Sequence, residues 1–147
     1  MFMHRLFILS VLLWSQLSFA GNDIAALLQK GYEQTEAGQL DQAEQTLQTA
    51  VSKAPDSSLA YTRLGGVKVL RQHYSDGVKD FQQAIMLDQN NASAFVGMAV
   101  AYLHMGEQGL AKAALQEAMR LDPSKKTEID KVLAWIEQRA YTPTVTH

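Results

Sequence analysis

The chain has 147 residues, a formal net charge of −2 at pH 7, a hydrophobic share of 47% and no cysteine. The length suits one domain, and the hydrophobic share is too high for a disordered chain. The absence of cysteine excludes disulfides, thiolate metal sites and cysteine nucleophiles, and the lack of a basic excess argues against nucleic acid as a partner.

The first twenty residues have the layout of a secretory signal peptide. Arg5 stands before the apolar run LFILSVLLW, and small residues follow at Ser18 and Ala20. We therefore expect residues 1–20 to be cleaved off and the mature chain, without a membrane span, to be exported to the periplasm. A retained membrane anchor is the alternative, but the apolar span of residues 6–20 is shorter than the roughly 20 residues of a spanning helix.

From residue 24 onward the chain repeats itself at an interval of 34 residues. Each copy contains a small residue, then a large apolar residue four positions later, then an alanine three positions after that. This spacing places the three residues on one face of a helix. The three sets are Ala43, Leu47 and Ala50; Gly77, Phe81 and Ala84; and Ala111, Leu115 and Ala118.

A second stripe of the same period precedes each of these helices. Its members are apolar or small at offsets of three, four and seven residues, as on one helical face. The sets are Leu27, Lys30, Gly31 and Gln34; Tyr61, Leu64, Gly65 and Lys68; and Phe95, Met98, Ala99 and Tyr102. The sequence therefore predicts three units of two amphipathic helices each, at about residues 24–57, 58–91 and 92–125.

The segments between the predicted helices contain turn and cap residues. Gly38 and Gly106 stand where the first helix of a unit should end, because glycine accepts the left-handed conformation found there. The middle unit has Gln72 at this place. Asp41, followed by Glu44, predicts a helix start of the capping-box kind.

The period and the residue pattern resemble those of the tetratricopeptide repeat family. The third unit matches the family pattern best, at Phe95, Met98, Ala99, Tyr102, Ala111, Leu115, Ala118 and Pro123. The second unit departs from it at Lys68, and the first at Lys30 and Gln34. The resemblance implies an all-α fold, a right-handed solenoid of three helix-turn-helix repeats plus a capping helix, over residues 21–140.

The predicted capping helix covers about residues 124–139. Its apolar stripe consists of Ile129, Val132, Leu133 and Ile136. A stack of repeats leaves its last apolar face open, and a terminal helix can cover that face. Trp135 lies at the edge of the stripe, where we expect it to complete the cap rather than to form a partner surface. Residues 141–147 have no pattern and are expected to form a flexible tail.

No arrangement of residues in the chain suggests catalysis. His73 and His104 show no metal-ligand spacing. The sequence contains no serine nucleophile motif flanked by glycines and no phosphate-binding loop. We therefore expect no enzymatic activity, no cofactor and no metal. The triplet Asn91-Ala92-Ser93 fits a glycosylation acceptor, but a helix start between two repeats is the preferred interpretation.

The resemblance also implies a concave groove, lined by the first helix of each unit. By the 34-residue register, its candidate contact residues are Leu28, Tyr32, Thr62, Arg63, Val69, Val96, Val100 and His104. Some family members hold an acidic peptide terminus with basic residues here, and only Arg63 would fit that role. The largely apolar set indicates an apolar or amphipathic peptide segment as ligand. Burial of these residues by the molecule itself is the alternative.

The expected function is that of a non-catalytic protein-interaction module, an adaptor or assembly factor for a cell-envelope complex. A periplasmic holding chaperone is the alternative. A self-assembling structural protein and an enzyme are less favoured, and homo-oligomer formation stays open.

Overall fold

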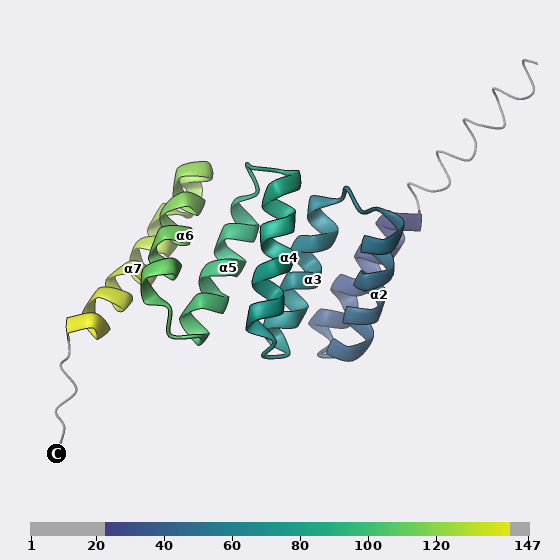
Figure 1. Cartoon of the computed structure of the whole chain (residues 1–147), viewed down its shortest axis with the longest axis horizontal. Helices are drawn as coiled ribbons and strands as arrows, with labels where there is room; N and C mark the ends of the chain where they lie inside the picture. The colour runs from purple at the N-terminus through teal and green to yellow at the C-terminus, as the bar shows by residue number, and fades with distance from the viewer. Residues whose placement is uncertain (1–22, 142–147) are drawn as a thin grey trace, which may run out of the picture. The chain divides into compact units, whose positions relative to one another are not determined.

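The computed structural model describes residues 23–141, and every regular element in that range is a helix (Figure 1). The chain divides into two compact units, Met1–Pro55 and Asp56–His147. The predicted signal peptide and residues 142–147 of the predicted tail lie outside the described residues. Within them, the predicted all-α architecture of helix-turn-helix repeats is confirmed.

The described part of the first unit is one helical hairpin. A helix over residues 23–36 is followed by α2 (Leu40–Lys53). Ala43, Leu47 and Ala50 are buried. The two helices approach closely at Gly31, where an added Cβ would lie 2.6 Å from the Leu47 side chain. A larger residue would therefore force the two helices apart, which explains why this position is small.

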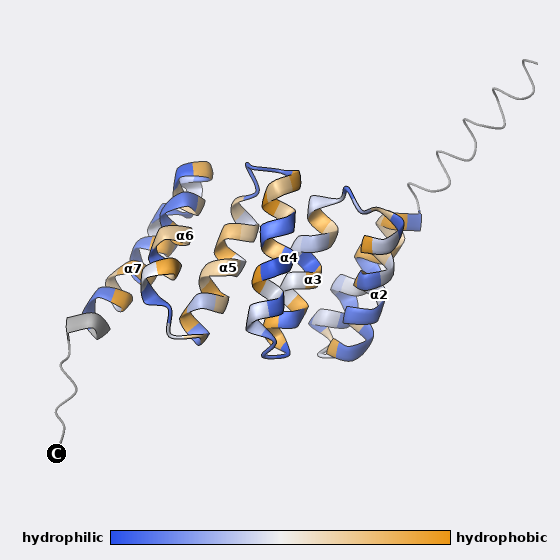
Figure 2. Ribbon diagram, in the orientation of Figure 1, coloured by the Kyte–Doolittle hydropathy of each residue, from blue (hydrophilic) through white to orange (hydrophobic). Residues whose placement is uncertain are grey.

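The second unit contains two further hairpins and a terminal helix. Their elements are α3 (Ser58–Leu70), α4 (Tyr74–Leu87), α5 (Ala92–His104), α6 (Gln108–Leu121), the 3-10 turn η1 (Pro123–Lys125) and α7 (Lys126–Tyr141). Helix α3 packs against α4 and α5, α5 packs against α6, and α7 packs against α6 and η1. Hydropathy differs along this series, because α5 is mostly hydrophobic whereas α4 alternates between polar and apolar residues (Figure 2).

Phe81 is the centre of the contact between α3, α4 and α5. Its side chain is only 2% exposed and packs with Ala84 and Ala94. A Cβ at Gly97 would collide with its ring, and one at Gly65 would lie 3.0 Å from it. The glycines of α3 and α5 thus leave the space that the phenylalanine of α4 fills.

A second core joins α5, α6 and α7. Ala99, Leu115 and Ala118 are buried there together with Ile129 and Ile136 of α7. Val132 and Leu133 pack against the same cluster, so the stripe predicted for the capping helix is confirmed. Trp135 keeps 44% of its surface exposed and therefore contributes to the cap only at its edge.

The turns between paired helices share one backbone conformation. Gly38, Gln72 and Gly106 have φ angles of 72°, 65° and 79°. Gln72 therefore adopts the left-handed conformation that glycine adopts in the other two turns. This conformation is energetically unfavourable for a residue that carries a side chain.

Helices α3 and α5 have side-chain N-caps, whereas α2 does not. The side chain of Ser57 caps α3, and that of Asn91 caps α5 by accepting a hydrogen bond from the Ala94 N–H at 2.9 Å. The capping box predicted at Asp41 is wrong. Helix α2 begins at Leu40, because the carbonyl of Gln39 already accepts the first helical hydrogen bond from Ala43.

Candidate functional site

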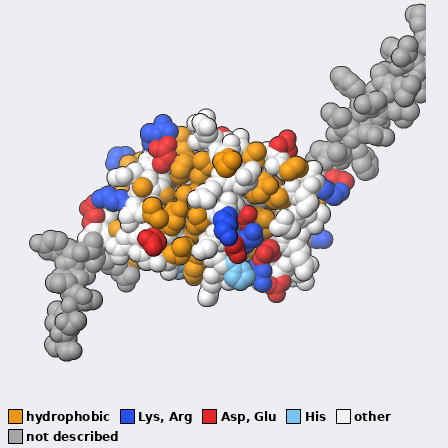
Figure 3. Space-filling model, in the orientation of Figure 1, with side chains coloured by type: hydrophobic (Ala, Val, Ile, Leu, Met, Phe, Trp, Pro, Cys, Tyr) orange, Lys and Arg blue, Asp and Glu red, His pale blue; other side chains and the backbone are white. Residues whose placement is uncertain are grey.

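A cleft of about 350 Å³ opens between α5 and α7, with α6 beneath it. Most of its lining is apolar. The lining residues are Ser93, Val96, Ala99, Val100, Leu103, Leu115, Lys125, Glu128, Ile129 and Val132. On the face turned toward the viewer, Figure 3 shows hydrophobic side chains gathered over α5 and its border with α6.

The helical register of α5 and α7 produces this cleft. Val96 and Val100 lie four residues apart, on the same face of α5. Ile129 and Val132 lie three residues apart on α7 and face them across the cleft. Buried Ala99 and Leu115 form the floor. The small alanine leaves room above the floor, and Val100 remains 40% exposed at the opening.

Two of the predicted groove residues, Val96 and Val100, line the cleft. His104, predicted beside them, does not, because its ring stacks on Tyr74 with centroids 4.8 Å apart and an interplanar angle of 3°. The stack joins the end of α5 to the start of α4. His104 is thus engaged with its own chain.

The predicted residues on α3 have other environments. Val69 packs against the core around Phe81 and lies next to Gly77, so it faces α4. Arg63 is half-buried. Thr62 lines a second, polar pocket, where its hydroxyl donates to the Ser58 carbonyl and accepts from Asn91, both at 2.8 Å.

Leu28 and Tyr32 belong to the first unit and differ in exposure. Leu28 is 8% exposed, which agrees with the alternative of burial by the molecule itself. Tyr32 keeps 48% of its surface exposed. Of the predicted residues in this unit, only Tyr32 therefore offers a large surface to a partner.

The polar pocket has a volume of about 390 Å³ and lies where α3 and α5 begin and α6 ends. Its lining residues are Ser58, Leu59, Thr62, Asp88, Asn90, Asn91, Ala92, Ser93, Leu121 and Asp122. The Asn91 amide donates to the hydroxyls of Ser58 and Thr62, both at 2.8 Å. This supports the interpretation of Asn91 as a helix start, since both ends of its amide are used within the fold.

Hydrogen bonds from Ser124 stabilise the charged form of Asp122 at the edge of this pocket. The Ser124 hydroxyl and backbone N–H donate to Oδ1, and they hold the pKa of this carboxyl below its usual range. Asp122 is therefore ionised well into the acidic range and keeps a negative charge beside the pocket at neutral pH.

Sequence reasoning missed one wall of the cleft. Ile129 and Val132 were assigned to a cap that covers the last repeat, and they do pack there. Their remaining surface lines the cleft together with Lys125 and Glu128. The stripe on α7 was visible in the sequence, but its angle to α5, which leaves the gap, was not.

No group of three or more potential ligands among His, Asp and Glu comes together in residues 23–141. None of the helices described here combines the length and the apolar character needed to cross a bilayer.

Family models for the tetratricopeptide repeat match residues 25–57 and 92–125. These are the first and third predicted units, and the structure has the same helix pair at residues 58–87 between them. The chain belongs to the tetratricopeptide repeat family. This membership supports a role as a protein–protein interaction module.

Two relatives are similar in sequence to part of this chain. The chain is 26% identical over 97 residues to the Hsp70-Hsp90 organizing protein of Triticum aestivum, covering 66% of this chain and 17% of that protein. It is 29% identical over 90 residues to the peroxisomal targeting signal receptor of Komagataella phaffii, covering 61% of this chain and 15% of the receptor. The chain thus spans less than a fifth of the length of either relative.

Solved structures share the fold at low identity. The type III secretion translocator chaperone SycD of Yersinia enterocolitica superposes with a TM-score of 0.77 at 18% identity, covering 82% of this chain and 96% of SycD. The first repeat domain of Spaghetti (RPAP3), bound to an HSP90 peptide, superposes with a TM-score of 0.77 at 17% identity, covering 82% and 95%. SycD is also known in complex with a peptide of the translocator YopD.

Proposed function

We propose that this chain is a non-catalytic interaction module that holds an apolar or amphipathic segment of a partner protein in the cleft between α5 and α7. The observation that carries the proposal is the cleft itself. Val96, Val100, Ile129 and Val132 give it apolar walls, and Val100 is exposed at its opening. Apolar anchors of a helix or an extended segment bind in pockets of this kind.

Peptide complexes of proteins with the same fold support this mode of binding. The Spaghetti domain holds an HSP90 peptide, and SycD holds a peptide of YopD. The HSP90 peptide, SRMEEVD, is acidic. In this chain the α5 side of the cleft presents valines, so its ligand should be recognised by apolar anchors rather than by acidic groups.

The proposal includes export, with the chain acting as an adaptor or assembly factor of a cell-envelope complex. This part rests on the signal-peptide pattern of residues 1–20 alone. Cell fractionation and mass spectrometry of the purified protein test it. A periplasmic protein that begins at Gly21 is expected, whereas an intact N-terminus in the cytoplasmic fraction would contradict export.

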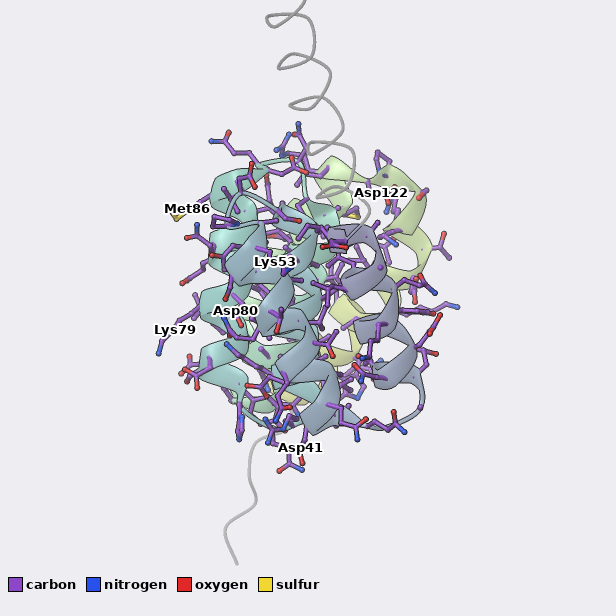
Figure 4. The ribbon with its side chains drawn as sticks, turned by 90° about the vertical axis from the view of Figure 1, so that its right-hand side faces the viewer. Asp41, Lys53, Lys79, Asp80, Met86 and Asp122 are labelled. Carbon is purple, nitrogen blue, oxygen red and sulfur yellow. The ribbon has the colours of Figure 1, made fainter. Side chains whose placement is uncertain are left out.

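Site-specific photo-crosslinking in living cells tests the binding site. A crosslinker at Val100 should capture one discrete partner, and a Val96→Glu change in the same protein should abolish that capture. Met86 is the control position, since it is 75% exposed and extends outward from α4 (Figure 4). Equal capture from both positions, or capture of only the protein itself at Val100, would contradict the proposal.

A holding chaperone is the second candidate function, favoured by the fold shared with the translocator chaperone SycD. The two functions differ in the number of ligands. An adaptor should yield one partner at a fixed stoichiometry, whereas a chaperone should yield several unfolded clients. The number of species captured at Val100, and the stoichiometry after purification, distinguish them.

A further inference from the structure

The apolar cleft and the polar pocket meet at one residue. Ser93, in the first turn of α5, lines both of them. From Ser93 the apolar cleft follows α5 toward Val96 and Val100, and the polar pocket continues toward Asp88 and Asp122. A segment seated in the cleft can therefore place its next side chain in the polar pocket.

The polar pocket is negatively charged for two reasons. Asp88 and Asp122 are the C-terminal cap residues of α4 and α6. A helix C-terminus carries a partial negative charge, which adds to that of the carboxylate. Two helix ends and two carboxylates thus act on the same space.

None of the described residues that line the polar pocket has a basic side chain. Lys125 is the basic residue of the neighbouring cleft, where Glu128 stands beside it as an acidic counterpart. Lys125 also contributes to the low pKa of Asp122, though less than the Ser124 hydroxyl does. Lys125 lines the cleft and not the polar pocket, whose described lining contains two carboxylates.

Each of the two carboxylates uses only one of its oxygens in hydrogen bonds with the described residues. Oδ1 of Asp88 accepts from the Asn90 N–H at 3.0 Å, and Oδ1 of Asp122 accepts from Ser124. All hydrogen bonds of these two carboxylates with described residues use Oδ1. The fixed turn orients each carboxylate, and Oδ2 can accept a bond from a ligand.

We propose that the partner segment carries a basic side chain, lysine or arginine, next to its apolar anchor, and that this side chain enters the polar pocket between Asp88 and Asp122. The inference rests on the proposed function, because the apolar anchor in the cleft places the basic group. The inference also gives the orientation of the partner segment. The apolar part of the segment lies along α5 toward Val100, and its basic end lies at Ser93.

Three synthetic peptides test this directly. They share the same apolar anchors and a fluorescein label and differ at one flanking position, which is lysine, glutamine or glutamate. Fluorescence anisotropy with the mature chain should show the lysine peptide binding about threefold to tenfold tighter than the glutamine peptide, and the glutamate peptide weakest. Added salt should reduce the difference.

Two matched double variants locate the effect. Asp88→Asn with Asp122→Asn should remove the preference for lysine, because asparagine retains the acceptor for the turn but not the charge. Asp76→Asn with Glu117→Gln changes the net charge equally at an exposed and a half-buried position outside both pockets and should retain the preference. Circular dichroism checks that both variants fold. If the variant with Asp88→Asn and Asp122→Asn does not fold, the inference is judged from the preference of the wild type for the lysine peptide and from the salt dependence of that preference.

The outcomes separate the inference from the proposed function. Equal binding of the three peptides, or a lysine preference that survives Asp88→Asn with Asp122→Asn, overturns the inference and leaves the apolar site standing. Absence of binding by all three peptides, or binding that Val100→Glu leaves unchanged, overturns both.

Discussion

The hairpins α3–α4 and α5–α6 have the same backbone plan, yet they differ at the positions that face away from their shared core. Where α5 has Val96 and Val100, α3 has Thr62 and Gly66, 34 residues earlier. Thr62 is hydrogen-bonded within the fold, and a Cβ at Gly66 would meet no atom of the described residues within 4 Å. The third repeat therefore presents two apolar side chains where the second presents a hydroxyl and a glycine.

The two hairpins also differ at one pair of equivalent positions, which face each other between the two helices of each hairpin. Tyr102 of α5 and Ala114 of α6 fill a position that Lys68 of α3 and Asp80 of α4 occupy in the second repeat. Lys68 Nζ lies 2.6 Å from Asp80 Oδ2, and both side chains are less than one fifth exposed. A repeat can thus exchange an aromatic contact for an ion pair without losing its fold.

The largest effect is expected from the core residue that distinguishes the second repeat. Phe81→Ala should lower the free energy of unfolding by about 3–5 kcal/mol, because it leaves a cavity between three helices. Leu115→Ala, the equivalent change in the third repeat, should cost about 2–4 kcal/mol, since it removes a smaller side chain. Urea denaturation measures both, and Gln82→Ala, at an exposed neighbour, should have almost no effect. A smaller cost for Phe81→Ala than for Leu115→Ala would contradict this ranking.

Exchanging the ion pair for the aromatic contact should be less costly than breaking it. Asp80→Ala leaves Lys68 largely buried without this partner and should cost about 2–3 kcal/mol. Lys68→Tyr combined with Asp80→Ala reproduces the pair of the third repeat and should recover most of that loss. Denaturation of the single and double variants gives the comparison. A double variant less stable than Asp80→Ala alone would show that the two hairpins are not interchangeable here.

The turns of the two hairpins allow a reciprocal exchange. Gln72→Gly should stabilise the protein by about 0.5–1 kcal/mol, because the left-handed conformation at φ 65° disfavours a side chain. Gly106→Gln should destabilise it by a similar amount at φ 79°. The two shifts in denaturation midpoint should therefore have opposite signs, and shifts of the same sign would contradict the role given to this conformation.

The smallest effect concerns the acidic turns after α4 and α6. Asp122 receives two hydrogen bonds from Ser124, whereas Asp88 receives one, from the Asn90 backbone. The folded pKa of Asp122 lies below its usual 3.8. Its stabilising contribution is therefore full above that value and is lost as the pH falls through the folded pKa.

Ser124→Ala should consequently lower stability slightly at neutral pH and have less effect in strong acid, where Asp122 is protonated. Denaturation at both pH values measures the difference. Asn90→Ala keeps the backbone donor to Asp88 and serves as the matched control. An effect of Ser124→Ala that does not change with pH would contradict this role of the hydroxyl.

The sequence predicted the repeats well because their signals are local. The 34-residue period, the small residues at Gly31 and Gly65 and the N-cap at Asn91 each act within one helix or between neighbouring helices. The candidate site was harder to predict. Val96 and Val100 followed from helical register, but the opposite wall depends on the angle at which α7 meets α6. The stacking of His104 on Tyr74 has no signal in the local sequence.

The central claim is that the cleft between α5 and α7 holds an apolar anchor of a partner. The most direct measurement compares the affinity of Val100→Glu and Met86→Glu for the partner captured at Val100, or for the lysine peptide. Both changes replace an exposed apolar side chain with a carboxylate, but only Val100 lines the cleft. Val100→Glu should weaken binding by about tenfold or more, and Met86→Glu by less than about twofold. Equal effects of the two changes, or none at Val100, would contradict the claim.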